Sequence, residues 1–374
     1  QDAWFASLNS SWTTEITGFN LRTYYQAYQT GNLIHYYEHR INGSAAQSFN
    51  NLGPYPDFMN ESENYYSFDG IYFYKELTDM LDDYREGTFG RAFNSSPYYN
   101  YYLYLPHRTK SAYTANDINN LVINRGYTSK PTSTSTLTGS QSMLHNEGTS
   151  FINAQNKFGA NAILAFGVAV NESAWGRSNF AINRNNLFGH AAYDYDPGGN
   201  ASSYASVASS INAHADRYVS ASYSRPGGNN YFGSHLGNKG SGMNVKYASD
   251  PYWGEKAAQE YFSFDRNSGM ADFEKYQIGV KKTDPANAPL NVRKEPSTSS
   301  SILYTMKNSV MGVANIPVVI LDTVEGTEVN GSKVWYKIQS DAVLDENRNA
   351  LTSVPSNHTY NWEKNYGFVH SSFI

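Results

Sequence analysis

The sequence contains no cysteine. This absence excludes disulfide bridges, thiolate nucleophiles, cysteine-ligated zinc and iron–sulfur clusters. Charged residues are also scarce, at 16% of the chain against a typical share of about 25%. The 28 Lys and Arg residues do not outnumber the 33 Asp and Glu residues, and the net charge is -5. Because nucleic-acid binders usually carry a basic surplus, we expect no nucleic-acid partner.

Long hydrophobic runs are missing as well. The longest apolar run extends from Ala162 to Val170, which is far short of the roughly 20 residues that a membrane-spanning helix needs. We therefore expect no membrane span. The chain begins at Gln1 without a signal-peptide pattern, so we expect a mature product or a piece of a longer protein.

Aromatic residues, in contrast, are abundant. They make up 15% of the chain, with 32 Tyr, 19 Phe and 6 Trp. A tyrosine ring can stack on a ligand while its hydroxyl forms a hydrogen bond, so this composition suits a large neutral polar ligand such as a glycan. It equally suits a secreted β-rich protein with tyrosines on its strands. Composition alone leaves both interpretations open.

The chain divides into three regions of different texture. Residues 1–135 are rich in aromatic clusters and include one segment, residues 75–85, with helical spacing of its apolar side chains. A Ser/Thr-rich stretch at residues 128–136 has the composition of a loop or linker. We expect this first region to pack on the core.

Residues 136–270 are predicted to be mainly helical. Apolar periodicity predicts helices near residues 151–158, 162–171, 204–219 and 253–262, with Gly159 ending the first of them. Residues 275–374 change period: short β-branched and aromatic runs at residues 318–321, 333–338 and 366–369 lie between turn residues. This last region therefore predicts a small β-barrel or sandwich.

The strongest chemical signal is a lone carboxyl group at the end of the predicted buried helix. Residues 172–178 read Glu-Ser-Ala-Trp-Gly-Arg-Ser. Positions three apart share a helix face, so the indole of Trp175 is predicted to shield Glu172 from water. Desolvation raises a carboxyl pKa, which suits a general acid near neutral pH. The alternative is a helix-capping Glu172 or an ion pair with Arg177.

Two further motifs combine amides, aromatic rings and polar groups. Residues 183–189 read Asn-Arg-Asn-Asn-Leu-Phe-Gly, which suits a sugar-binding groove or, alternatively, an Asn-rich turn. Residues 242–253 place polar and aromatic groups before a helix, and Ser249 or Asp250 could cap that helix with Pro251 in its first turn.

Together these motifs carry a resemblance. Residues 172–178, 185–189 and 247–251 resemble, in order and over about 80 residues, the peptidoglycan N-acetylglucosaminidases of glycoside hydrolase family 73. The resemblance covers roughly residues 140–264. It implies a lysozyme-like, mainly α core with a groove, a catalytic acid at Glu172 and a functional tyrosine at Tyr247.

The second catalytic group stays open. In this family it varies in position and lies on a β-hairpin lobe after the second motif, where this sequence offers Asp194 and Asp196 but no glutamate. Asp216 is predicted to form a surface ion pair instead. Asp194 could activate water for inversion, or the substrate's own acetamido oxygen could attack the anomeric carbon while Tyr247 stabilises the developing charge.

No metal or other cofactor is expected. The 9 His residues are scattered, the chain has no His-Glu-x-x-His motif, and no glycine-rich phosphate loop is present.

The C-terminal region resembles a bacterial SH3-like domain at residues 290–297, 335–338 and 366–374, with residues 341–364 as a long insertion. Such modules bind the cell wall or pack against a catalytic core, and the sequence does not decide between these roles.

These observations predict a multi-domain α+β protein. Its parts are an aromatic region (1–135), a lysozyme-like core with a small β-hairpin lobe (136–270) and an SH3-like β-barrel (275–374). We expect a secreted, wall-associated, monomeric endo-β-N-acetylglucosaminidase that hydrolyses the β-1,4 bond between N-acetylglucosamine and N-acetylmuramic acid in peptidoglycan strands. A lytic transglycosylase, a muramidase and a non-catalytic wall-binding protein are the alternatives. The predicted catalytic residues are Glu172, Tyr247 and Asp194, and the predicted substrate-binding residues are Asn185, Asn186, Phe188, Asp250, Tyr252 and Trp253.

Overall fold

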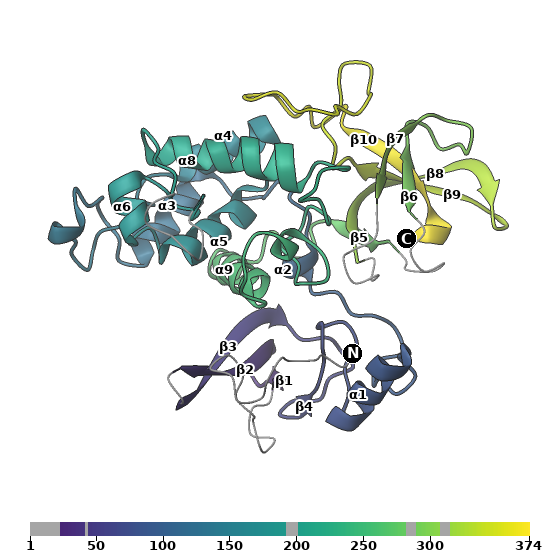
Figure 1. The fold of residues 1–374 in the computed structure, drawn as a ribbon, viewed down its shortest axis with the longest axis horizontal. Helices are drawn as coiled ribbons and strands as arrows, with labels where there is room; N and C mark the ends of the chain where they lie inside the picture. Colours follow the sequence, from purple (N-terminus) through teal and green to yellow (C-terminus); the bar gives the residue numbers. More distant parts are fainter. Residues whose placement is uncertain (1–22, 42–43, 192–200, 282–288, 307–314) are drawn as a thin grey trace, which may run out of the picture. The chain divides into compact units, whose positions relative to one another are not determined.

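The computed structural model describes residues 23–41, 44–191, 201–281, 289–306 and 315–374. Its contacts group the chain into two compact units, residues 1–100 and 101–374, each of which is described by itself (Figure 1). Within the described ranges, no helix combines the length and the apolar composition that a membrane crossing requires.

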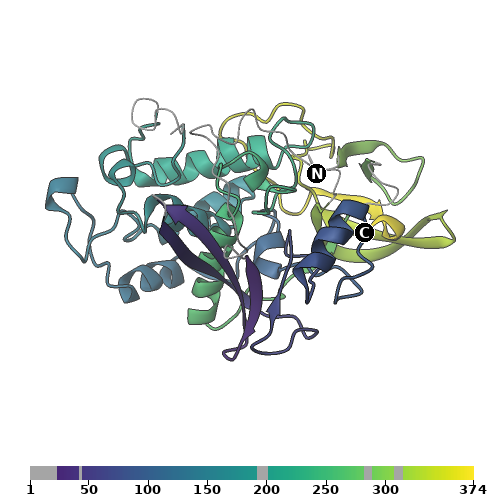
Figure 2. The same ribbon diagram turned by 60° about the horizontal axis from the view of Figure 1, so that its bottom comes forward.

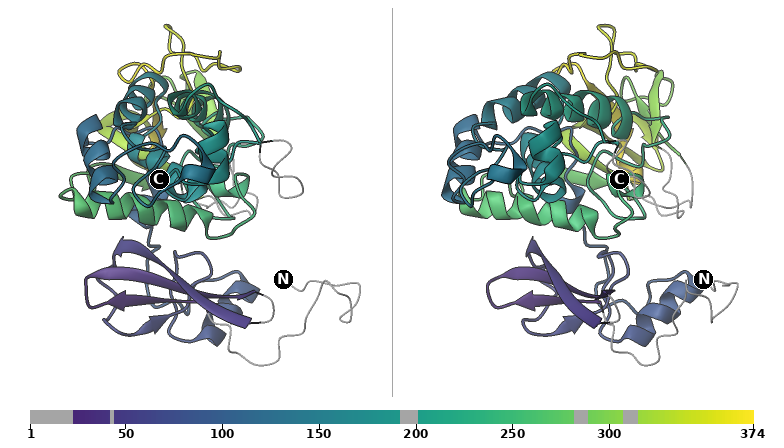
Figure 3. Two further views of the ribbon diagram at one scale, coloured as in Figure 1. Left: turned by 90° about the vertical axis from the view of Figure 1, so that its left-hand side faces the viewer. Right: turned by 60° about the vertical axis from the view of Figure 1, so that its left-hand side comes forward.

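The first unit is built on an antiparallel sheet. Its described strands pair in the order β3-β2-β1-β4, and the sheet is drawn in purple in Figure 3. Alternating side chains of β1 and β2, including Tyr25 and Leu33, bury one face against Tyr65 and Phe73. The aromatic clusters of this region thus supply the unit's own core. The elements are β1 (Tyr24–Tyr28), β2 (Asn32–Ile41), β3 (Ser44–Pro54), β4 (Asn64–Tyr65) and α1 (Leu77–Glu86).

The second unit begins with a helical part around one fully buried helix, α5. In α5, all residues except Asn171 and Glu172 are buried. Asn161 caps its N-terminus by accepting hydrogen bonds from the N–H groups of Ile163 and Leu164. The α-helices are α2 (Tyr101–Tyr104), α3 (Ala115–Asn124), α4 (Gly148–Phe158), α5 (Ala162–Ser173), α6 (Asn179–Arg184), α8 (Val207–Ala213) and α9 (Trp253–Asn267).

Helices α5 and α9 pack closely because α5 carries a glycine at their contact. A Cβ atom on Gly167 would lie 2.7 Å from the carbonyl oxygen of Ala257 in α9. Any larger side chain there would force the helices apart, and this contact fixes the end of α5 relative to the start of α9. That relation positions the candidate site described below.

Short irregular helices complete this part of the chain. Helix α8 continues as a π-helical segment, and the other short segments are single 3-10 turns. The predicted helices are confirmed, including the end of α4 at Gly159, which adopts a left-handed conformation with φ of 71°. The segments are η1 (Thr134–Thr136), η2 (His214–Tyr223), η3 (Met243–Val245) and η4 (Ser371–Phe373).

The division between the two units falls at Asn100, earlier than the predicted boundary at residue 135. Residues 101–135 pack with the second unit: Tyr102 of α2 donates a hydrogen bond to Asp265 of α9 at 2.7 Å, and Asn119 of α3 accepts one from the N–H of Gly148 at 2.8 Å. The Ser/Thr-rich stretch, whose composition suited a loop or a linker, lies within this unit as η1 and its flanking loops.

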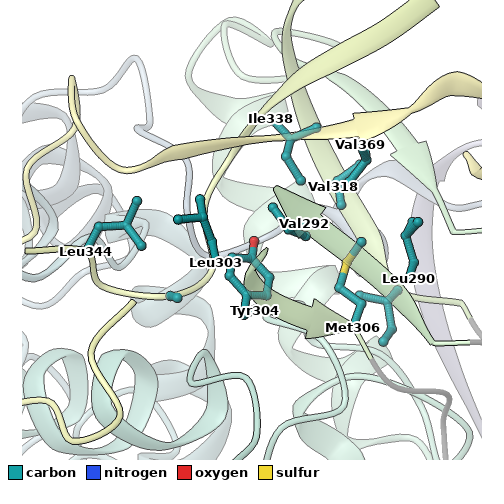
Figure 4. Packing of buried hydrophobic residues seen from close by; sticks show 11 residues of the cluster. Leu290, Val292, Leu303, Tyr304, Met306, Val318, Ile338, Leu344 and Val369 are labelled. Carbon is teal, nitrogen blue, oxygen red and sulfur yellow. The ribbon is translucent and has the colours of Figure 1, made fainter. Parts of the chain in front are cut away.

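The end of the second unit is rich in β-structure. Its described strands form an antiparallel sheet in the order β5-β8-β9-β10-β6-β7, coloured green to yellow in Figures 1 and 2. Figure 4 shows its apolar core, in which Val292, Met306, Ile338 and Val369 are fully buried. The strands are β5 (Gln277–Val280), β6 (Leu290–Arg293), β7 (Ile302–Met306), β8 (Pro317–Val329), β9 (Ser332–Gln339) and β10 (Tyr366–His370).

A buried polar network joins this sheet to the helices. Arg108 is 1% exposed and donates to the backbone oxygen of Asp341 from Nε at 3.0 Å and Nη2 at 2.8 Å. Its Nη1 donates to the carbonyl oxygens of Phe158 and Gly159. The carboxylate of Asp341 accepts a hydrogen bond from Tyr231 at 2.8 Å. Because these groups are buried and paired with one another, the sheet is an integral part of the second unit.

Candidate active site

The lone carboxyl group at the end of α5 is the centre of the site. Glu172 is partly exposed, although the helix that carries it is buried. The helix ends one residue later, because Ala174 adopts a left-handed conformation with φ of 49°. A carboxyl group at this point borders the apolar core and can still be reached from outside the protein.

Trp253, the first residue of α9, contacts this carboxyl group directly. Its indole Nε1–H donates a hydrogen bond to Oε1 of Glu172. Burial raises the pKa of Glu172 to about 7, the charge of Asp250 adds to the rise, and the Trp253 hydrogen bond opposes it. Glu172 therefore holds a proton over much of the neutral range, as a general acid must.

The predicted shielding of Glu172 by Trp175 is wrong. That prediction assumed a continuous helix, but α5 ends before Trp175, whose own φ is +62°. The Trp175 ring packs instead against Tyr127 and Phe166, with centroid distances of 6.0 Å to each. The alternative ion pair with Arg177 is not the geometry found, since Arg177 Nη1 donates to the backbone oxygen of Thr138 at 2.9 Å.

Tyr247 lies beside Trp253, as expected for a residue of the same site. The two rings stack with centroids 4.4 Å apart, and the Tyr247 hydroxyl donates to the carbonyl oxygen of Phe188 at 3.0 Å. Burial raises the pKa of Tyr247 well above its usual value. Tyr247 is therefore a neutral phenol throughout the working range of pH, with its proton directed toward the backbone.

The two asparagines of the second motif form hydrogen bonds with the backbone of the loop that follows them. Asn185 ends α6 in a left-handed conformation, and its Nδ2 donates to the carbonyl oxygen of Tyr204 at 2.9 Å. Asn186, which is 1% exposed, donates to the backbone of His190 and Ser202 at 3.1 Å each. In this structure their amides are engaged within the loop.

Phe188 is the centre of an aromatic stack rather than part of an open surface. Its ring is 1% exposed and lies parallel to His214, with centroids 3.9 Å apart. The carbonyl oxygen of Phe188 faces Tyr247, as described above. This residue therefore contributes to the site through its backbone, while its ring anchors the loop.

The remaining predicted residues are placed as follows. Asp250 accepts a hydrogen bond from the N–H of Tyr252 at 2.9 Å and pairs with Lys256 at 2.6 Å. It does not cap α9, which begins at Trp253 with Tyr252 in the capping position. Tyr252 is partly exposed. Asp194 and Asp196, together with the predicted hairpin lobe around them, lie outside the described residues.

Two residues that pack on the ring of Tyr247 could not be identified from the sequence. Tyr223 and His214 of the π-helical segment η2 pack on its ring, at centroid distances of 5.5 and 6.2 Å. Burial lowers the pKa of His214 well below its usual value, so it is neutral. A π-helix, which occurs frequently at functional sites, gives no distinct sequence signal beyond that of an ordinary helix.

Across the described ranges, no cluster of three or more His, Cys, Asp or Glu side chains is arranged to hold a metal ion.

Known proteins match the part of the chain that carries this site. Residues 148–265 match the glucosaminidase family described as mannosyl-glycoprotein endo-beta-N-acetylglucosaminidase. This segment is therefore a glucosaminidase-type domain, and it contains Glu172, Tyr247 and Trp253.

Two curated relatives come from Streptococcus pneumoniae strains TIGR4 and R6, and both are provisionally named endo-beta-N-acetylglucosaminidase. Each is 39% identical over 131 residues, which is 35% of this chain. The match spans less than a fifth of the relatives' length, 19% and 18% respectively.

Among solved structures, the chain is similar to autolysin E of S. aureus. The free form gives a TM-score of 0.32 at 21% identity, covering 46% of this chain and 73% of that one. A catalytic mutant of the same autolysin in complex with the disaccharide NAG-NAM gives 0.31 at 21% identity, with 45% and 73% covered.

Proposed function

We propose that this protein is an endo-β-N-acetylglucosaminidase. It hydrolyses the β-1,4 bond between N-acetylglucosamine and N-acetylmuramic acid in bacterial peptidoglycan. The observation that carries this proposal is Glu172, a partly exposed carboxyl group with a pKa of about 7 within a glucosaminidase-type domain. A carboxyl group that is protonated near neutral pH can protonate a departing glycosidic oxygen.

In the first step, Glu172 gives its proton to the glycosidic oxygen as the bond to the anomeric carbon breaks. Positive charge then develops on the sugar. Because the Tyr247 hydroxyl directs its proton at the Phe188 carbonyl, its oxygen lone pairs are free to face that charge or the N–H of the acetamido group.

The substrate's acetamido oxygen completes this step by bonding to the anomeric carbon. Water then attacks the same carbon and opens the ring intermediate, while the Glu172 carboxylate takes a proton from that water. Glu172 is then protonated again, and the enzyme is back in its starting state. This route needs no carboxylate nucleophile from the protein, and substrate-assisted chemistry is a recognised exception to the two-carboxylate rule.

The rival route uses Asp194 to activate water for direct inversion. The two routes give opposite stereochemistry, since the acetamido route retains the β-anomer and direct attack inverts it. Proton NMR of the fresh reducing end, recorded within the first minutes of hydrolysis, separates them. We expect the β-anomer first, and the α-anomer would assign the second step to a protein carboxylate such as Asp194.

Sugar contacts come from the partly exposed residues of the third motif. We assign that role to Tyr247 and Tyr252, which are partly exposed. Asn185, Asn186 and the ring of Phe188 shape the loop beside them. Asp250 holds the backbone before α9 and adds negative charge near Glu172.

We also propose that the C-terminal sheet is an SH3-like module. Its antiparallel strands around one apolar core support this assignment. The buried Arg108–Asp341 network supports a structural role for it within the second unit, in addition to any contact with the wall. Activity on peptidoglycan would place the protein outside the cell, in association with the wall.

The test is the identity of the new reducing end. Purified peptidoglycan is digested, the fragments are reduced with borohydride, and the reduced sugars are identified by mass spectrometry. N-acetylglucosaminitol is expected. N-acetylmuramitol would indicate a muramidase, an anhydro sugar would indicate a transglycosylase, and wall binding without new ends would indicate a non-catalytic protein.

A further inference from the structure

The two oxygens of Glu172 lie in different surroundings, and the difference begins with Trp253. Trp253 is 2% exposed, and its indole N–H donates to Oε1. Stacking on Tyr247 at 4.4 Å holds the indole plane in place. An indole nitrogen is a donor only, so Oε1 must act as the acceptor whether Glu172 is charged or neutral.

The second oxygen, Oε2, lies beside the backbone of Gly189. A Cβ atom built on Gly189 would lie 3.0 Å from Oε2, which is closer than nine in ten such contacts in proteins. Gly189 also has a φ of +62°, a conformation that favours glycine. Since Trp253 holds Oε1, the carboxyl group cannot turn easily to relieve such a contact.

We propose that Trp253 and Gly189 together assign the roles of the two Glu172 oxygens: Oε1 stays hydrogen-bonded to the indole, and Oε2 carries the proton and delivers it to substrate in the space that Gly189 leaves open. This inference rests on the proposed function, in which Glu172 is the acid. Trp253 is accordingly a positioning residue, although the sequence had suggested a sugar contact for it.

The arrangement also favours the proton transfer itself. A hydrogen bond to an ionised carboxylate is stronger than one to a neutral carboxyl group. The bond from Trp253 therefore strengthens as Oε2 loses its proton, and it stabilises the transition state more than the ground state. Removing the donor should both slow the reaction and raise the pKa of Glu172.

The titration of Glu172 near neutral pH is separate from that of the charged and titratable groups around it. From the segment before α9 these are Asp250, with its partner Lys256, and Tyr247. His190 and His214 stack on Phe188, whose carbonyl oxygen accepts the hydrogen bond from Tyr247. Burial lowers the pKa of His190 to about 3 and that of His214 well below its usual value, so both are neutral near pH 7.

The first experiment is nuclear magnetic resonance of the indole groups, which needs no activity. The chain has 6 Trp residues, so 15N labelling of tryptophan gives a small set of indole signals. We expect one signal to shift with a midpoint near pH 7. It should be missing in Trp253→Phe and should lose its titration in Glu172→Gln. If no indole signal titrates near pH 7, the contact between Trp253 and Glu172 is refuted.

The second experiment is the pH profile of kcat/KM on peptidoglycan for Trp253→Phe. We expect the basic limb to move up by about one pH unit or more, and the maximal rate to fall about tenfold or more. Trp175→Phe is the matched control, because that ring packs on Tyr127 and Phe166, and its limb should not move. An unmoved limb in Trp253→Phe, or an equal shift in both variants, would overturn the role of Trp253.

The third experiment compares Gly189→Ala with Gly227→Ala. Both glycines have positive φ, but a Cβ on Gly227 would meet nothing within 4 Å. Both variants therefore carry backbone strain, and only Gly189→Ala crowds Oε2. We expect a fall in kcat of at least tenfold for Gly189→Ala alone, at similar melting temperatures. Equal rates in the two variants would refute the proposal that Oε2 delivers its proton in the space beside Gly189.

These outcomes are separable from the proposed function. If the wild-type protein releases no N-acetylglucosamine ends, the glucosaminidase assignment fails, whatever the indole signals do. If it releases those ends and the Trp253→Phe profile matches the wild type, only the assignment of the two oxygens fails.

Discussion

Replacing Glu172 by Gln should remove activity and at the same time stabilise the protein at alkaline pH. The pKa of Glu172 rises from an ordinary 4.5 to about 7 because the folded protein desolvates it. The unfolded chain therefore releases this proton at lower pH than the folded protein does. The folded protein loses stability as pH rises from about 4.5 to about 7, and the loss is complete above pH 7.

The size of this effect follows from the shift. At about 1.4 kcal/mol per pKa unit, ionisation of Glu172 lowers the free energy of unfolding by about 2–3 kcal/mol, allowing for its partial exposure. Gln cannot ionise, and its oxygen can still accept the hydrogen bond from Trp253. Glu172→Gln should therefore be more stable than wild type by about that amount at pH 8.5, and equally stable at pH 4.

Urea unfolding at both pH values, followed by tryptophan fluorescence, measures this difference. Glu346→Gln is the control, because Glu346 is exposed and pairs with Lys364 at the surface, so it should change stability by less than about 1 kcal/mol at either pH. If Glu172→Gln gains no stability at pH 8.5, the carboxyl group is not desolvated, and the reasoning from burial to general acid is refuted.

Three further predictions follow from the same contacts. In wild type, kcat/KM should fall about tenfold per pH unit above pH 7, as the acid form of Glu172 is lost; a flat profile to pH 9 would contradict the pKa of about 7. Tyr247→Phe should lower kcat by roughly tenfold or more with little change in KM, because it removes the oxygen that faces the developing charge; unchanged steady-state kinetics would make Tyr247 structural. Arg108→Met should cost about 3 kcal/mol or more in a thermal unfolding assay, because it leaves the carbonyl oxygens of Phe158 and Asp341 unpaired; a change below 1 kcal/mol would contradict the buried network.

The sequence predicted the elements of the second unit well, because their signals are local. Apolar spacing identified α5 and α9, Gly159 marked the end of α4, and β-branched runs identified β8 and β9. The carboxyl group of interest was also found from local pattern, since it is the only acidic residue in a nearly apolar helix.

The partners of that carboxyl group could not be predicted in the same way. Trp253 reaches Glu172 across 81 positions of sequence, and only the packing of α5 on α9 through Gly167 brings them together. Trp175 was the nearer tryptophan in sequence, but α5 ends at Ser173, and the left-handed residues Ala174 and Trp175 turn the indole away from the carboxyl group. Such a chain reversal has no reliable signal when the residue is not glycine.

The aromatic excess has a similar explanation. Tyrosines suggested a glycan ligand from composition, yet many are packed inside the protein, including Tyr65 in the first unit and Tyr261 in the second. Phe188 was predicted as a sugar contact from its motif, and its ring stacks on His214 instead. Residue type indicated the chemistry of the site, while burial decided which rings could take part.

The most direct test of the central proposal is a count of new reducing ends on purified peptidoglycan, comparing the wild-type protein with Glu172→Gln. After borohydride reduction, the wild type should yield N-acetylglucosaminitol, and Glu172→Gln should yield at least roughly a hundredfold less, since general acid catalysis contributes 10²–10⁴-fold. N-acetylmuramitol from the wild type, or more than about a tenth of the wild-type yield from Glu172→Gln, would contradict the proposal.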